Sequence, residues 1–336
     1  SCCLLSASTC SGIVTVQSTA AIVANACSKM GIPSSRQGWA HATNSHDKLK
    51  DALMDPRVTA IEADLLMGTD QSEHGLKEKR VPIMAHPPED SSDLPLDVFL
   101  RRVTKELASQ PGKRHLEKHI KLDFKDMESV EPALKMLKEF DVCVEERTIF
   151  LNADVLHGPG RSATDVSVSA DHFIETCLNL LAEESRGVVF SLGFKVDVVH
   201  PFGHTEEHIR EMIRVVQRHD LTNRSSGVVL AINARLLVKN LSPFETFLKH
   251  FPTSQLLAWT ASGEPPISKR KIERIKHHFH VHGTLDRVGF DCNVAETLLG
   301  GLTYDVLLDL YGVFLFLVKM FSLAYSRLVG GKKKVA

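Results

Sequence analysis

The chain has 336 residues, of which 43% are hydrophobic and 24% are charged, and its formal net charge is −1. This composition is typical of a globular protein with a sizeable core, and the length allows one large α/β domain or two ordinary ones. Acidic and basic residues balance and no basic stripe alternates with aromatic residues, so a nucleic-acid partner is excluded; the seven cysteines form no Cys-x-x-Cys pair, which argues against a structural zinc site.

Residues 1–36 are predicted to be a leader that lies outside the fold. The first 46 residues contain no Asp or Glu, and an apolar run ends in Ala24-Asn25-Ala26, a small-x-small pattern that resembles a signal-peptidase site. No basic stretch precedes this run, so a disordered leader is the alternative to a cleaved targeting segment. The first interpretation predicts a secreted or membrane-associated protein, and the second leaves a cytoplasmic one open.

Beyond the leader, short apolar or β-branched runs alternate with helical patterns, which is typical of parallel βα units. The predicted strands are Gly38–His41, Val58–Leu65, His119–Phe124, Thr148–Ala153, Gly187–Leu192, Gly227–Ile232, Leu256–Thr260 and Arg287–Asp291. A further run, Pro82–His86, is assigned to a hairpin extension of the second strand. The predicted helices are Leu96–Ser109, Glu128–Glu139, Ala170–Glu184, Thr205–Arg218, Pro243–Lys249 and Ser268–His277.

Eight strands with helical crossovers over about 250 residues predict a (β/α)8 barrel, the TIM barrel, which we assign to residues 37–303. A doubly wound open sheet is the alternative fold. No Gly-x-Gly-x-x-Gly turn follows a predicted strand, so the fingerprint of a dinucleotide-binding sheet is missing.

The last predicted segment, residues 304–336, is an apolar helix with a basic tail. Charged residues at Asp309, Lys319 and Arg327 leave an uninterrupted apolar run only over Leu310–Val318. This run is shorter than the roughly 18 residues expected of a clean membrane span. A helix that covers the barrel or lies at a membrane surface is the leading interpretation, and a span followed by cytosolic lysines is the alternative.

Two histidines and three carboxylates fall at or near predicted strand ends in the first half of the chain, where a barrel carries its reactive groups. Alternation places Glu62 and Asp64 on one face of a strand, where they repel each other unless a cation or a basic partner lies between them. Together with Asp123 they could bind one Mg²⁺ or Ca²⁺, and His41 and His86 could then act as nucleophile or base and as acid. A solvated carboxylate pair is the alternative.

A histidine-rich segment, residues 277–282, follows a Lys- and Arg-rich predicted helix. His278, His280 and His282 alternate, so on one face of a strand they could serve as imidazole ligands. A surface connection without a ligand is the favoured interpretation.

Several of these segments resemble the menorin family. They are Trp39–Ser45, Ile61–Asp64, Pro82–Pro88, Lys121–Lys125, and Leu151–Leu156 with Gly158-Pro159, and the resemblance covers about Gly38 to Asp291. That family is a distant relative of the glycerophosphodiester phosphodiesterases and the spider-venom sphingomyelinase D enzymes, in the PLC-like phosphodiesterase superfamily. Those relatives share a barrel and one divalent metal.

The resemblance implies a role for each candidate residue. Glu62, Asp64 and Asp123 would ligate one Mg²⁺ or Ca²⁺, and His41 and His86 would form the catalytic pair. The implied substrate-binding residues are Lys125 for the phosphate, Trp259 as an aromatic wall of the pocket, and Asn44 and Asn152 as contacts to the substrate or to the ligating groups.

The sequence departs from the phosphodiesterase pattern beside both histidines. Glycerophosphodiesterases usually read His-Arg-Gly at the first and His-Asp at the second, whereas Ala42 and Pro87 follow the histidines here. The missing arginine removes a bidentate phosphate clamp.

The implied function is a metal-dependent, phospholipase D-like phosphodiesterase that acts on a phosphodiester such as a glycerophosphodiester or a lysophospholipid. The alternative is a non-catalytic extracellular or membrane-associated binding or adhesion module of the menorin type, with a receptor or membrane partner.

Overall fold

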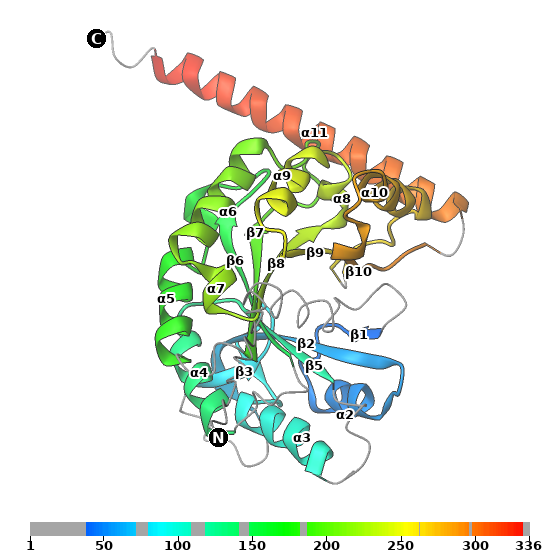
Figure 1. Ribbon diagram of the computed structural model, residues 1–336. Coiled ribbons are helices and arrows are strands. Elements are labelled where there is room, and N and C mark those ends of the chain that lie inside the picture. Colours follow the sequence, from blue (N-terminus) through cyan, green and yellow to red (C-terminus); the bar gives the residue numbers. More distant parts are fainter. Residues whose placement is uncertain are drawn as a thin grey trace, which may run out of the picture.

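The computed structural model describes residues 38–71, 80–108, 118–140, 148–181, 187–261, 263–295 and 298–331. The predicted leader and the lysine-rich tail lie outside these residues. Figure 1 shows strands at the centre, helices around them, and one long helix lying across one end.

Eight parallel strands of a ten-stranded sheet form the barrel, in the order β1-β2-β5-β6-β7-β8-β9-β10. Their bounds are β1 Gly38–Ala40, β2 Val58–Asp70, β5 His119–Phe124, β6 Ile149–His157, β7 Val188–Lys195, β8 Gly227–Asn233, β9 Gln255–Trp259 and β10 Val288–Asp291. The path from β1 to β10 is continuous, but among the described residues no backbone pairing joins β10 to β1. The barrel is therefore nearly closed, with one open seam between these two strands. The prediction of a TIM-like α/β barrel is confirmed.

The predicted hairpin extension is also present. Strand β3, Arg80–Met84, runs antiparallel to the second half of β2, and the short β4, Ser91–Ser92, pairs with the end of β2 in parallel. This hairpin is why β2 extends to Asp70, beyond the strand end that the sequence predicts.

Helices cover the outside of the barrel in each interval where one was predicted (Figure 1). They are α3 Leu96–Ala108, α4 Val130–Glu139, α5 Ala170–Leu180, α6 Glu206–Arg218, α9 Ser242–His250 and α10 Lys269–Val281. The structure adds α2 His46–Met54 and the single turns α7 Leu221–Arg224 and α8 Ala234–Leu237, which the sequence reading missed. The prediction ended α10 at His277, but the helix continues to Val281.

Strand alternation divides the side chains of β2 between two environments. Ile61, Ala63 and Leu65 are fully buried in the main core. Glu62 and Asp64, on the opposite face, line a cavity inside the barrel. A local pattern of period two therefore decides which residues stabilise the fold and which remain available for chemistry.

Helix α11, Leu298–Gly331, lies across the barrel and is held there by its charged residues. Asp305, 3% exposed, accepts a hydrogen bond from Arg235 at 2.8 Å, and Asp309 lies 3.0 Å from Lys271. Its outward side chains are apolar and exposed, and include Tyr304, Val306, Leu307, Leu310, Tyr311, Val313, Phe314, Leu317, Val318, Met320 and Phe321. None of the helices in the described part of the chain has the length and apolar character needed to cross a membrane.

Candidate active site

The register of four neighbouring strands builds one polar layer inside the barrel. Asp64 of β2 pairs with Asp123 of β5, Asp123 with Asn152 of β6, and Asn152 with Ser191 of β7. Residues in register point to the same face of a sheet. The Ser191 hydroxyl donates to Asn152 Oδ1 at 2.6 Å, and Asn152 Nδ2 donates to Asp123 Oδ1 at 2.7 Å. Asn152 therefore orients Asp123.

The three predicted metal ligands come together around this layer. Glu62, Asp64 and Asp123 each bring a carboxylate oxygen within 4.8 Å of the others. Burial raises the pKa of Glu62, which is 2% exposed. An all-oxygen donor set of this kind suits a hard divalent cation such as Mg²⁺ or Ca²⁺.

Lys125 is fixed by two of these carboxylates. Its Nζ lies 2.8 Å from Asp64 Oδ1 and 2.5 Å from Asp123 Oδ2. Burial alone would lower the pKa of Lys125, but Asp123 and Asp64 raise that pKa above its ordinary value, so the ammonium stays charged. Burial would likewise raise the pKa of Asp123, and Lys125 lowers it. Among the described residues, Lys125 is the lysine whose ammonium makes an ion pair with these carboxylates, and it contacts Asp64 and Asp123 but not Glu62.

The turn after β1 holds the two carboxylates of β2. The backbone N–H of Ala42 donates to Glu62 Oε2 at 2.7 Å. Asn44 Nδ2 donates to Asp64 Oδ2 at 2.8 Å, and Asn44 Oδ1 accepts from the Asp64 N–H at 3.0 Å. Ala42 has a φ of 50°, a left-handed conformation that costs an L residue about 1–2 kcal/mol. A strained turn therefore fixes the carboxylates in place.

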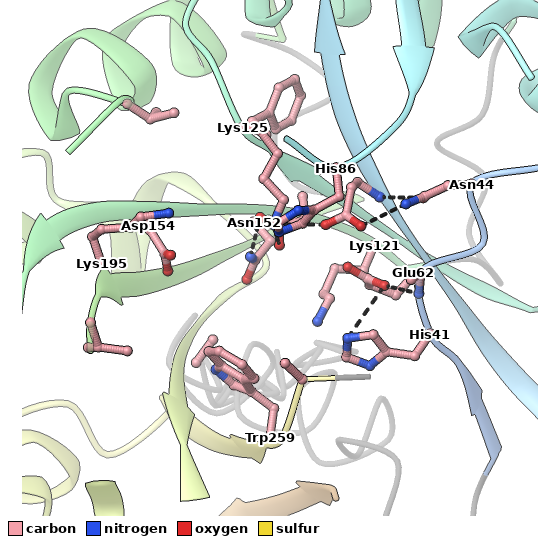
Figure 2. Close-up of a pocket in the computed structure, with 18 of the residues that line it drawn as sticks. His41, Asn44, Glu62, His86, Lys121, Lys125, Asn152, Asp154, Lys195 and Trp259 are labelled. Carbon is pink, nitrogen blue, oxygen red and sulfur yellow. Dashed lines mark hydrogen bonds and ion pairs between the residues drawn. The ribbon is translucent and has the colours of Figure 1, made fainter. Parts of the chain in front are cut away.

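His41 bridges the two ends of the sheet through Asp291. Its Nδ1 lies 2.9 Å from Asp291 Oδ2, at the end of β10. Its Nε2 lies 3.8 Å from Glu62 Oε2, as Figure 2 shows. An ionised carboxylate only accepts hydrogen bonds, so Asp291 holds the proton on Nδ1 and leaves Nε2 facing the carboxylates. Burial alone would lower the pKa of His41, but Glu62 and Asp291 raise it above its ordinary value.

The nine residues predicted for the site all line one cavity of about 480 Å³. Figure 2 shows His41, His86 and Trp259 around it. His86 is exposed, and its Nδ1 lies 2.7 Å from the carbonyl oxygen of Pro87. This contact uses Nδ1 and does not involve Nε2. The distant strand ends are thus brought together as expected, although their chemical roles remain predictions.

The cavity has further charged walls that the sequence reading did not assign to the site. Lys121, Asp154 and Lys195 line it, and Asp291 reaches it through His41. Burial, followed by the charge of Asp123, raises the pKa of Asp154 to about 6. Strand alternation is the signal that was available: Lys121 precedes Asp123 by two positions, and Asp154 follows Asn152 by two, so both share the inward face.

One glycine makes room for this extra carboxylate. A Cβ at Gly193 of β7 would lie 2.5 Å from Asp154 Oδ1. Any side chain here would displace the carboxylate from the cavity wall, so Gly193 is part of how the barrel accommodates a fourth acid.

Comparison with known proteins identifies relatives of this chain. A family model described as the Menorin N-terminal domain matches residues 35–288. Human protein FAM151B is 31% identical over 243 residues, which cover 72% of this chain and 78% of that protein.

Solved structures resemble the chain more distantly. A catalytic-site mutant of active domain 2 of chitinase from Pyrococcus furiosus gives a TM-score of 0.46 at 11% identity, over 83% of this chain and 96% of that chain. The 3-keto-D-glucoside 4-epimerase YcjR from E. coli gives a TM-score of 0.33 at 11% identity, over 65% and 87%. Likeness at this level carries no argument about function.

Proposed function

Because this chain belongs to the menorin family, we propose that it is a divalent-metal-dependent phosphodiesterase-like enzyme, of the PLC-like and phospholipase D-like type, acting on a lipid-borne phosphodiester such as a lysophospholipid. One observation carries the proposal. Glu62, Asp64 and Asp123 converge within 4.8 Å, and the Nε2 of His41 lies 3.8 Å from the nearest of the three. A cation and a reactive nitrogen would thus meet in one cavity.

The cation proposed for this cluster is Mg²⁺ or Ca²⁺, which when bound supplies positive charge against the negative charge that develops on the reacting phosphate. The ammonium of Lys125 contacts both Asp64 and Asp123, and it lowers the pKa of Asp123 against the effect of burial. Asn44 and Asn152 fix the orientation of Asp64 and Asp123 through hydrogen bonds. The chain thus presents oriented oxygen ligands before any cation arrives.

The two histidines would divide the proton transfers. Asp291 holds the proton of His41 on Nδ1, so in this proposal Nε2 attacks phosphorus or takes a proton from an internal hydroxyl of the substrate. Asp291 would stabilise the imidazolium that results, as an orienting carboxylate does in a catalytic triad. His86 would donate a proton to the leaving oxygen from across the cavity.

Phosphate recognition would rest on lysines, because the arginine of the glycerophosphodiesterase pattern is replaced by Ala42. Lys121, Lys125 and Lys195 all line the cavity. Lysine acts as a point charge and does not grip two phosphate oxygens in a planar fork. We therefore expect weaker discrimination among phosphodiester head groups than an arginine clamp gives.

The proposal of a lipid substrate rests on helix α11. The segment after β7 lines the cavity with Val196 and Val198, and its next residues contact α11: a Cβ on Gly312 would meet the Val199 carbonyl oxygen, and His200 packs edge-on against Phe316. Helix α11 thus borders the same end of the barrel as the cavity, and its apolar side chains that do not pack on the barrel are exposed. A lipid surface is one environment that covers such a face at little cost.

The test is a substrate screen on the full chain. The protein is stripped with a chelator, reloaded with Mg²⁺ or Ca²⁺, and offered glycerophosphodiesters and lysophospholipids, with release of the head group measured. We expect turnover that depends on the cation and is fastest on a lysophospholipid. A cation-dependent rise in Tm without turnover of any phosphodiester would contradict the enzyme and favour the non-catalytic binding module.

A further inference from the structure

A second group of metal-ligating side chains lies away from the cavity, between α9 and α10. Glu245 of α9 faces His278 of α10 and His282, the residue that follows α10. Glu245 Oε1 lies 2.5 Å from His278 Nε2 and 3.2 Å from His282 Nδ1, and the ligand atoms of the three residues lie within 4.8 Å of one another. None of the three lines the barrel cavity.

Helical geometry selects these two histidines from the histidine-rich segment. The alternation of His278, His280 and His282 suggested a strand, which is wrong, because the chain is helical as far as Val281. On a helix, positions four apart share a face, so His278 and His282 stack with ring centroids 4.6 Å apart. His277 and His280 are exposed and take no part in the group.

The carboxylate of Glu245 is buried, and the lysine beside it is not in close contact. Glu245 is 8% exposed, and the ammonium of Lys249 approaches its Oε2 only to 3.4 Å. Nε2 of His278 is shielded from solvent and aimed at the carboxylate, yet it makes no hydrogen bond of acceptable geometry.

We propose that Glu245, His278 and His282 form a Zn²⁺ site that ties α9 to the end of α10. Two imidazole nitrogens and one carboxylate oxygen are a ligand set that zinc prefers, and the fourth position would be taken by water at the exposed His282. The site uses no cysteine, so the missing Cys-x-x-Cys spacing does not bear on it. It is independent of the proposed phosphodiesterase activity.

The spacing of the ligand atoms is close to what the ion needs. With zinc–ligand distances of about 2.0–2.2 Å, tetrahedral ligand atoms lie about 3.3 Å apart. Glu245 Oε1 and His282 Nδ1 already meet this spacing, and His278 Nε2 would withdraw by less than about 1 Å. Nδ1 of His282 also lies 2.8 Å from the carbonyl oxygen of His278, a contact that zinc would replace.

The experiment is a zinc titration of the full chain by calorimetry. Accessible thiols are first alkylated, because Cys2, Cys3, Cys10 and Cys27 could bind zinc themselves, and excess Mg²⁺ is present to compete at the barrel cavity. We expect one zinc per chain with a rise in Tm, and at least a tenfold loss of affinity in His282→Gln. His282 is exposed, so this variant should fold. His280→Gln, an exposed histidine on the same helix, is the matched control and should bind zinc like the unmodified chain.

Cobalt provides a second measurement on the same proteins. Four-coordinate Co²⁺ absorbs visible light far more strongly than the octahedral ion, so a strong band that disappears in His282→Gln would support the site. A weak octahedral spectrum, zinc binding unchanged by His282→Gln, or an equal loss in His280→Gln would overturn the proposal.

Discussion

The barrel cavity and the α9–α10 group both gather acids and bases, but the two regions are built by different means. In the cavity, hydrogen-bonded register aligns Asp64 with Asp123 from separate strands, and the donors are oxygens. Between the helices, a spacing of four residues aligns His278 with His282, and nitrogens dominate. Strand register collects groups that are far apart in sequence, whereas helix spacing collects near neighbours. The ligand types would then separate the hard cation that we propose for the cavity from the zinc that we propose for the helix pair.

The largest effect that separates the two regions is expected from His41→Ala. Loss of the reactive nitrogen should lower kcat on the best phosphodiester by about 10⁴-fold, since a covalent or general-base group is removed. Zinc affinity and the unfolding midpoint should stay unchanged. His277→Ala, an exposed histidine, is the control, and full activity in His41→Ala would end the proposed mechanism.

Asp64→Asn should remove cation-dependent stabilisation at the cavity while leaving the helix pair untouched. At a cation concentration of 100 times Kd, binding stabilises the folded state by about 2.7 kcal/mol, and most of this should be lost. The measurement is thermal unfolding with and without Mg²⁺ or Ca²⁺. Glu245→Gln is the matched control, and it should keep the full cation-dependent shift. An unchanged shift in Asp64→Asn would place the cation elsewhere.

Asp291→Asn tests whether the bridge between β1 and β10 orients His41. The amide can no longer hold the proton on Nδ1 as a carboxylate does, so kcat should fall by about 10²- to 10⁴-fold. Loss of Asp291 also removes one cause of the raised pKa of His41, so the acid limb of the pH–rate profile should move to lower pH. A uniform loss of rate with no movement of the profile would indicate a purely structural role.

A histidine in neither region provides the reference for pH dependence. His204 is 1% exposed, packs against Phe194 and Phe244, and neither of its ring nitrogens has a partner in the described part of the chain. Burial lowers its pKa to about 3. The folded state thus binds fewer protons than the unfolded state, whose histidine titrates near 6.5.

The contribution of neutral His204 to the free energy of unfolding is therefore fully present above about pH 6.5, and it is lost as the pH falls toward 3. The loss should approach about 1.4 kcal/mol per pH unit. Denaturant unfolding from pH 7 to pH 5 measures this slope. His204→Met removes the titrating ring from an apolar site and should flatten the slope, and an equal slope in both proteins would assign the acid sensitivity to other groups.

The cavity residues could be predicted largely because they obey strand alternation. Glu62 and Asp64 interrupt an otherwise apolar strand on one face, and that pattern is visible without coordinates. Lys121 and Asp154 follow the same rule, but a charged residue at an inward position does not by itself show that it reaches the cavity. For the histidine-rich segment, the favoured surface connection and the alternative strand are both wrong, because the helix continues to Val281 and a helix end and a strand look alike over six residues.

The sequence by itself determined the order of strands and helices and the inward face of each strand, because hydrophobic periods of 2 and 3.6 residues are local properties. Only the tertiary structure decided that His41 meets Asp291, 250 positions away. That contact depends on how far the barrel closes, and closure is set by the twist and stagger of all the strands together. The same holds for Glu245 and His278, whose meeting depends on the packing of two helices against one another.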